Sequence, residues 1–229
     1  FIMIAIVFGA VIFDRSAISL RTFALAMIAA ERGKYAEAMK LYRDLIDSAK
    51  PGQAVRAIAS ASLALGRLEE KTGKRPEAEA SYRKALELRP GWSAGCERLG
   101  LLLSLGAQTK LDEAESLLSR VANPGVTVDL ARAAVAHRLA RVDDMAVHLN
   151  RLINRPEFQK LPKAVGRQVA LWGAEVRLLR KEFGAAADAL EQLARVEPTP
   201  AIEERLVQCR LLQAVQVVQQ IPLADGALD

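Results

Sequence analysis

Few of the residue types that usually carry chemistry occur in this chain. Its 229 residues include 2 cysteines and 2 histidines, and aromatic side chains make up 5%. His137 and His148 do not have the spacing of a zinc motif, and neither a Gly-rich phosphate loop nor a Gly-x-Ser-x-Gly turn occurs. The acidic pair Asp143-Asp144 lacks the oxygen-rich loop that calcium needs. We therefore expect no enzyme, no metal and no cofactor, although a site assembled from scattered residues would leave no motif.

Strand and disulfide patterns are also missing. No segment alternates apolar and polar residues between hairpin-turn signals. Cys96 and Cys209 lie far apart inside apolar helical patterns, so we expect two buried thiols and no disulfide. The composition is instead 51% hydrophobic and 26% charged, and it is rich in Ala, Leu, Glu and Arg. These residues favour helices, so the chain is predicted to be all-α.

Charge of one sign is not concentrated anywhere. The net charge is +5 and the isoelectric point is about 9.4, but basic and acidic residues are interleaved, as in residues 67–71. This pattern is typical of a solvated helix face with ion pairs between successive turns. Single-strand binders usually add aromatic residues among the basic ones, and these are absent here. We expect no nucleic-acid partner, and a basic helical-repeat RNA binder stays as an alternative.

Residues 1–13 contain no charged or polar side chain. As a helix they would span about 20 Å, less than the roughly 30 Å hydrocarbon core of a bilayer. Three interpretations are open: the end of a transmembrane helix that starts before Phe1, a buried helix, or the core of a signal peptide. Because the run has no polar face, a truncated membrane anchor over residues 1–16 is favoured. Its apolar side chains are Ile2, Ile4, Ile6, Val7, Phe8, Val11, Ile12 and Phe13.

Basic residues follow this apolar run closely. Arg15, Arg21, Arg32 and Lys34 outnumber Asp14 and Glu31 in this stretch. The positive-inside tendency then predicts that the following domain lies on the cytoplasmic side of the membrane.

An internal repeat organises the rest of the chain. Leu65-Gly66 and Leu99-Gly100 lie 34 residues apart, each within a helical pattern. Gly66 and Ala78 are small enough to let two helices approach closely, and Gly73 permits the turn between them. The remaining positions of the pattern are Tyr82, Ala85 and Pro90.

This spacing resembles the tetratricopeptide repeat. That family has a Leu-Gly pair in the first helix, a Gly at the turn, then Ala, an aromatic residue and Ala in the second helix, and a final Pro. All seven positions are matched between Leu65 and Pro90. The resemblance implies a right-handed superhelix of antiparallel helix pairs, a TPR-like α-solenoid.

Further units follow the same template with lower fidelity. The equivalent alanines, Ala38, Ala78, Ala114, Ala146 and Ala186, are spaced 40, 36, 32 and 40 residues apart. We therefore expect about five units over residues 17–200, a capping helix over 201–221 and a tail over 222–229. The fourth unit lacks the turn glycine. The capping helix is predicted to direct one apolar side towards the array: Ile202, Leu206, Cys209, Leu212 and Val215. The alternative is a helix that docks on a partner, because Val215, Val217 and Val218 make its end unusually apolar.

The resemblance also implies a concave groove, lined by the first helices, that binds a peptide or helix of a partner. By register the groove residues are Phe23, Met27, Leu63, Arg67, Lys71, Glu97, Leu101, Leu105, Val135, Arg138, Leu171, Glu175 and Leu178. The alternative for each leucine is packing between units. No Asn occurs at these positions, so the chaperone-type carboxylate grip of some family members is not expected.

The expected function is a membrane-anchored scaffold for protein–protein interactions, acting as an accessory subunit or assembly factor of a bacterial membrane or envelope complex. Its partner is expected to be a membrane-complex subunit or an amphipathic or apolar segment, which a groove of mixed apolar and charged residues suits. No small-molecule substrate is expected. The main alternative is a soluble TPR peptide-binding adaptor, in which the N-terminal run is a buried helix.

Overall fold

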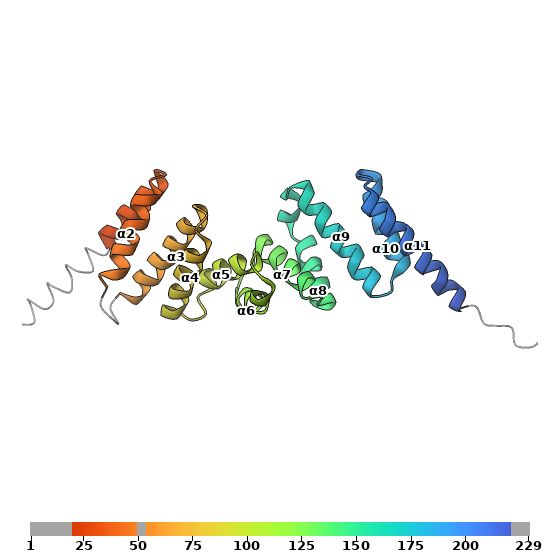
Figure 1. Cartoon of the computed structure of the whole chain (residues 1–229), viewed down its shortest axis with the longest axis horizontal. Helices are drawn as coiled ribbons and strands as arrows, with labels where there is room; N and C mark the ends of the chain where they lie inside the picture. Colours follow the sequence, from red (N-terminus) through yellow and green to blue (C-terminus); the bar gives the residue numbers. More distant parts are fainter. Residues whose placement is uncertain (1–19, 50–53, 221–229) are drawn as a thin grey trace, which may run out of the picture. The chain divides into compact units, whose positions relative to one another are not determined.

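The computed structural model describes residues 20–49 and 54–220, and all regular structure in these ranges is helical (Figure 1). The predicted anchor over residues 1–16 and the predicted tail over 222–229 lie outside the described residues. Across the ranges that are described, no helix combines the length and apolar character needed to cross a membrane. The chain forms two compact units, Phe1–Asn123 and Pro124–Asp229.

The first unit contains three helix pairs within its described residues. Residues 20–31 are helical and pair with α2. The labelled elements are α2 (Tyr35–Asp47), α3 (Val55–Lys71), α4 (Arg75–Leu88), α5 (Ser93–Ser104), the short 3-10 helix η1 (Gln108–Lys110) and α6 (Leu111–Ser119). Thus α3 pairs with α4, and α5 pairs with α6. The segment with η1 lengthens the turn of the third pair.

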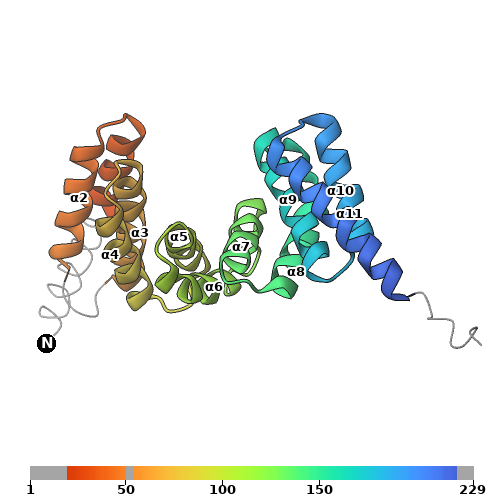
Figure 2. The same ribbon diagram turned by 45° about the vertical axis from the view of Figure 1, so that its right-hand side comes forward.

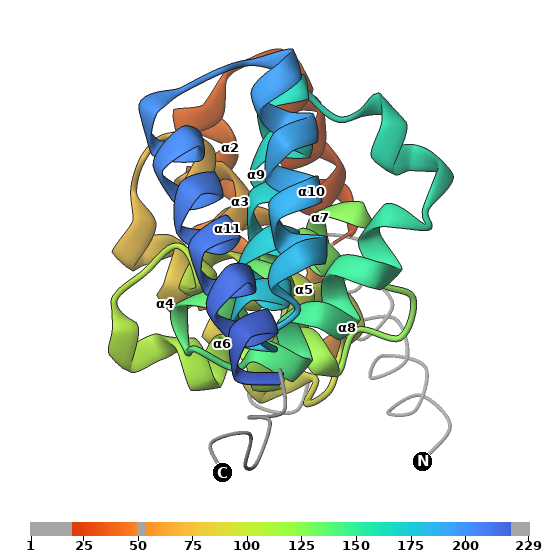
Figure 3. The ribbon, with the colours of Figure 1, turned by 90° about the vertical axis from the view of Figure 1, so that its right-hand side faces the viewer.

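The second unit contains two pairs and a final helix. Its elements are α7 (Val126–Arg138), α8 (Val142–Ile153), the 3-10 helix η2 (Pro156–Lys160), α9 (Lys163–Leu179), α10 (Phe183–Val196) and α11 (Pro200–Gln220). Helix α11 lies alongside α10 (Figures 2 and 3). The predicted all-α array of antiparallel helix pairs with a terminal helix is confirmed. The handedness of a superhelix through both units stays a prediction.

Four of the turns within pairs share one backbone geometry. Gly33, Gly73, Ala140 and Lys181 each have a positive φ, between 55° and 80°. In each turn the N–H of that residue donates to the carbonyl three residues earlier, and the next N–H donates to the carbonyl five residues before it. This is the Schellman pattern, which ends a helix and reverses the chain. Ala140 and Lys181 adopt this backbone geometry although they are not glycine. The fourth and fifth pairs therefore have the same turn without a glycine in the sequence to indicate it.

Small residues set the spacing within the second pair. A Cβ on Gly66 would lie 2.6 Å from Cε1 of Tyr82, so the tyrosine ring occupies the space that glycine leaves. Ala78 and Ala85 are fully buried on the same helix as Tyr82. The Tyr82 hydroxyl donates to Oε2 of Glu70 at 2.7 Å. The predicted close approach at Gly66 and Ala78 is therefore observed.

Helix α11 departs from its predicted inward face at one residue. Ile202 and Cys209 are buried against α10, but Val215 is 53% exposed. The cause is the helical register. At about 100° per residue Val215 lies about 140° around the helix from Ile202, whereas the half-buried Gln213 and Gln216 continue the covered side. Gly184, the second residue of α10, lies next to Gln213, and α11 then continues beyond the start of α10. The prediction that Val215 packs on the array was wrong for this reason.

Candidate partner-binding surfaces

A cavity of about 420 Å³ opens between the first helices of the first two pairs. Phe23 and Met27 line it from residues 20–31, and Leu63 and Arg67 line it from α3. All four were predicted groove residues. Successive first helices lie side by side here because Ala26 and Ala61 are fully buried in the shared core. The helix spacing that the alanines allow thus positions the cavity.

Three aromatic side chains make this first cavity predominantly apolar. The rings of Phe23 and Tyr42 meet edge to face, with centroids 5.5 Å apart. Trp92, just before α5, also lines the cavity, and Arg89 lies over its indole ring at 4.3 Å. Burial raises the pKa of the Tyr42 phenol, which keeps it uncharged. With Glu31 and Arg67 as its charged lining residues, the cavity suits an apolar side chain carried by a polar backbone segment.

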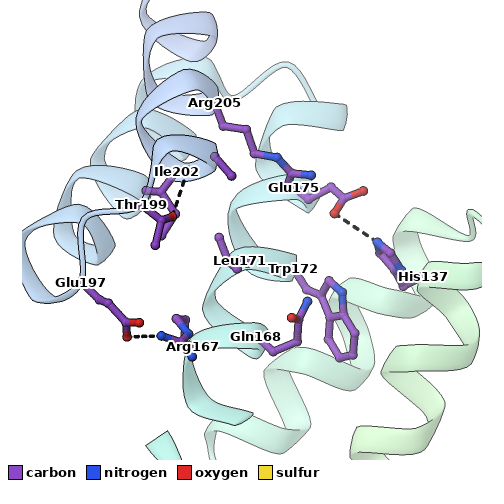
Figure 4. Close-up of a pocket in the computed structure, with 11 residues that line it drawn as sticks. His137, Arg167, Gln168, Leu171, Trp172, Glu175, Glu197, Thr199, Ile202 and Arg205 are labelled. Carbon is purple, nitrogen blue, oxygen red and sulfur yellow. Dashed lines mark hydrogen bonds and ion pairs between the residues drawn. The ribbon is translucent and has the colours of Figure 1, made fainter. Parts of the chain in front are cut away.

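A second cavity, of about 500 Å³, lies among α7, α9 and α11 (Figure 4). Leu171 and Glu175 were predicted groove residues, and both line it. Leu171, Trp172 and Ile202 supply its apolar wall. The polar and charged residues around it are His137, Arg167, Gln168, Glu175, Glu197, Thr199 and Arg205.

Most polar groups of this second cavity are held by one another. Nε2 of His137 lies 3.1 Å from Oε2 of Glu175, and the imidazole and the Trp172 indole have centroids 5.4 Å apart. Arg167 forms an ion pair with Glu197. Arg205 extends from α11 into the cavity and has no ion-pair partner in the described part of the chain (Figure 4). The cavity therefore offers one available positive charge beside an aromatic wall.

The other predicted groove residues line neither cavity. Lys71 has its ammonium 4.7 Å from the centre of the Tyr35 ring. Leu105 is 66% exposed at the end of α5, Arg138 is exposed, and Leu178 packs on the core between α10 and α11. Glu97 and Leu101 are half-buried on α5.

Val135 requires a correction. Its exposure is 0%, so it belongs to the interior of the second unit and not to a partner-binding groove. In the helical register it lies on the side of α7 that its neighbours cover, together with the buried Ala136.

The sequence did not point to Tyr42, Trp92, Trp172 or Arg205. Tyr42 belongs to a second helix, Trp92 to a loop and Arg205 to the terminal helix, whereas the groove was expected from first helices only. Trp172 alone carried a usable signal, because it adjoins Leu171 and stands three residues before Glu175 on one helix face.

The described residues contain no group of three His, Cys, Asp or Glu side chains that could hold a metal ion. Burial raises the pKa of both thiols, Cys96 and Cys209, which keeps them protonated and poor nucleophiles. The pKa of His148 is lowered, first by burial and then by Arg132 and Arg151. The two cavities offer shape, aromatic area and charge.

Comparison with known proteins agrees with this geometry. Residues 59–91 match the sequence model of the tetratricopeptide repeat. The fold is similar to that of PilW, described as a widely conserved type IV pilus biogenesis factor, with 18% identity, 91% of this chain and 96% of PilW covered, and a TM-score of 0.54. It is also similar to a tetratricopeptide repeat protein from Parabacteroides merdae, with 15% identity, 84% of each chain covered and a TM-score of 0.50. No curated protein sequence matches this chain.

Proposed function

Since this chain is a helical-repeat protein of the tetratricopeptide type, we propose that it is a scaffold whose two cavities bind segments of protein partners. The observation that carries the proposal is the cavity of the first unit, where Phe23, Met27 and Trp92 leave apolar area open to solvent between successive first helices. An amphipathic helix or an apolar segment matches this lining, because its apolar side chains would enter while its polar side chains meet Glu31 and Arg67.

We further propose that the partner belongs to a membrane or envelope complex, in which the protein acts as an accessory subunit or assembly factor. The apolar run over residues 1–13 supports this setting. An anchored scaffold would hold its cavities near the membrane surface, where subunits of such a complex are assembled. The repeat domain is proposed to lie on the cytoplasmic side, on the strength of the basic residues after the run.

The binding surface is tested by a matched pair of variants. Met27→Glu places a carboxylate at the first cavity, whereas Leu25→Glu places one two residues away, outside the lining. The two side chains are similarly exposed, 45% and 48%, so the variants differ mainly in position. In quantitative pull-downs from the native membranes, Met27→Glu is expected to lose a defined set of proteins that the wild type and Leu25→Glu retain.

Equal retention by Met27→Glu and Leu25→Glu would argue against the first cavity as the binding surface. The second cavity is tested in the same extract with Arg205→Glu, and with Arg177→Glu as a control outside its lining. Proteins lost in both cavity variants would be partners that need the whole array.

The membrane setting has its own test. Full-length protein in native membranes is expected to resist extraction by carbonate and high salt and to need detergent. Quantitative release without detergent would reject the anchor while leaving the scaffold role intact. Deletion of residues 1–13 is then informative, because loss of the fold would instead identify a buried helix.

A further inference from the structure

Helix α11 carries an apolar stripe on the side that faces solvent. Val207, Leu211 and Val218 are 58%, 62% and 66% exposed, and Ala214 between them is also exposed. On a helix of 3.6 residues per turn these four positions fall within about 60° of one another, opposite the buried Ile202 and Cys209. The outer face of a terminal helix in a repeat array is normally polar, because it must be soluble. We call these four residues the outer stripe.

The end of α11 also lacks support from its own unit. Gln213 lies beside Gly184 near the start of α10, so the following turns of α11 extend beyond that helix (Figures 1 and 2). Residues 211–220 are only Leu, Gln, Ala and Val, without a single charge. Valine has a modest helix propensity, and no ion pair stabilises these turns. Helical turns of this kind normally owe their stability to packing against another element.

We propose that the outer stripe pairs with the outer stripe of a second copy of this chain, with the two α11 helices antiparallel about a twofold axis. The spacings along the stripe are four, three and four residues, so the stripe reads the same in both directions. An antiparallel pair centred between Leu212 and Gln213 places Val207 against Val218 of the partner subunit. It also places Leu211 against Ala214 of the partner subunit, a large side chain against a small one.

Charge is compatible with this arrangement. Arg205 lies on the other side of α11, in the second cavity, and stays away from the second copy. Arg210 would lie opposite Val215 of the partner subunit, within the neutral stretch of residues 211–220, so like charges do not meet. Arg210 is in addition held by Asp188 at 3.1 Å and Glu191 at 3.0 Å within its own unit. A neutral apolar stripe gives a charged partner nothing to recognise, whereas a second copy supplies a surface of the same length, spacing and polarity.

The proposed interface between the two α11 helices is small, so dimerisation has to be tested up to high protein concentration. One pair of short helices buries less than the roughly 1,200 Å² of a standard specific interface, so dimerisation is expected at micromolar or higher concentration. Sedimentation velocity of the full chain in detergent solution, from about 1 to 500 µM, should show a reversible monomer–dimer equilibrium. Leu211→Glu would bury a carboxylate in each copy and is expected to weaken association by about 100-fold or more.

The matched control is Val196→Glu, because Val196 is 85% exposed in the same unit but lies on α10, outside the stripe. It should dimerise as the wild type does, and all variants should keep the wild-type circular dichroism. A chain that stays monomeric over the whole range, or equal loss of dimer in Leu211→Glu and Val196→Glu, would overturn the proposal. Either result would mean that the outer stripe is covered by something else, a different protein or another segment of the chain.

Cross-linking tests the direction of the pair. Val207→Cys and Val218→Cys are prepared as separate chains, in which the native Cys96 and Cys209 are fully buried. An antiparallel pair places like residues about 16 Å apart along the axis, beyond the roughly 7 Å limit for a disulfide. Mixed chains should therefore form the 207–218 disulfide, and neither variant alone should cross-link.

Cross-linking of each variant with itself would indicate a parallel pair and overturn the antiparallel register. The dimer does not depend on the cavities, so Met27→Glu should dimerise like the wild type. Failure of the proposed dimer and failure of partner binding can thus be told apart.

Discussion

At the scale of single residues, four turns show how one backbone geometry tolerates different side chains. Gly33 and Gly73 have φ values of 75° and 80°, which glycine adopts without cost. Ala140 and Lys181 have φ values of 55° and 62° in equivalent turns with the same hydrogen bonds. A residue with a Cβ is strained in this region, so the later turns are held by the packing of their helices.

This strain predicts stabilisation by glycine. Ala140→Gly and Lys181→Gly should each raise the free energy of unfolding by about 0.5–1 kcal/mol, because relief of strain exceeds the added entropy of the unfolded chain. Ala134→Gly, in the interior of α7, is the control and should lower it by about 1 kcal/mol. Urea denaturation followed by circular dichroism measures both effects. A lower stability of Ala140→Gly would contradict the strain.

His148 is the residue whose surroundings make stability depend on pH near neutrality. Its pKa is lowered by burial first and then by Arg132 of α7 and Arg151 of α8, whereas Asp144 and Asp129 act in the opposite direction. The imidazole is thus neutral in the folded state. The unfolded chain has an ordinary histidine, which takes up its proton near pH 6.5.

The sign of the effect follows from this difference. Between the unfolded and the folded pKa the unfolded chain binds more protons, so the free energy of unfolding falls as the pH decreases below about 7. His148→Gln should reduce this decrease. The pKa of Glu79 is lowered mainly by its hydrogen bond with Lys110, and the pKa of Glu113 mainly by its hydrogen bond with Arg83. These carboxylates therefore change the stability only in more acidic solution. Urea unfolding at a series of pH values should give a shallower slope for the variant, and equal slopes would exclude His148 as the cause.

At the scale of secondary-structure elements, one carboxylate joins three helices. Glu69 of α3 has a side-chain exposure of 3% and accepts from Nη2 of Arg43 on α2 at 2.7 Å. It also accepts from Oγ of Ser81 on α4 at 2.6 Å. A buried carboxylate with hydrogen bonds from two neighbouring helices fixes how the first pair lies on the second. The bidentate contact of Arg83 with Glu113, between α4 and α6, is more exposed and contributes less.

Removal of this carboxylate should loosen two helix contacts at once. Glu69→Leu is expected to lower the free energy of unfolding by about 1–3 kcal/mol, because Ser81 and Arg43 lose their charged acceptor. Hydrogen exchange measured by mass spectrometry should then be faster in both α2 and α4. Glu87→Leu, on an exposed position of α4, should change stability by less than about 0.5 kcal/mol. Faster exchange in α4 alone would show that Arg43 does not hold α2 in place.

At the scale of the whole molecule, many buried residues of the described ranges group into local clusters. One such cluster in the first unit includes Tyr42 and Leu65, and two in the second unit lie around Met145 and around Leu190. In repeat proteins stability is carried by each repeat and its nearest neighbours. A local defect should therefore weaken its own surroundings before it weakens distant pairs.

Gly66→Ala tests this locality. The added Cβ would lie 2.6 Å from the Tyr82 ring, which must move and cost about 1–3 kcal/mol. Hydrogen exchange should accelerate in α3 and α4 and stay unchanged in α9 and α10. Gly166→Ala is the control, because its Cβ would meet nothing within 4 Å. Uniform acceleration along the chain would instead indicate one cooperative unfolding unit.

Much of the fold was accessible from the sequence because it depends on local contacts. Leu65, Gly66, Gly73, Ala78 and Tyr82 act within a single helix pair, so their spacing alone specifies that pair. The turn at Ala140 was not foreseen, because its positive φ is imposed by packing and not by residue type. The groove was predicted in part: Phe23, Met27, Leu63 and Arg67 line a cavity together, but Val135 is buried and Trp92 had no helical register to be read from.

The sequence by itself determined that this protein is an array of helix pairs, since helix propensity, small residues and turn signals all act over short distances along the chain. Only the tertiary structure decided which residues meet across helices. It brought Arg205 to the cavity of α7 and α9, buried Val135 and left the outer stripe of α11 exposed. The physical reason is that the length and packing of neighbouring helices decide which face of a helix is covered, and the periodicity of one helix does not contain that information.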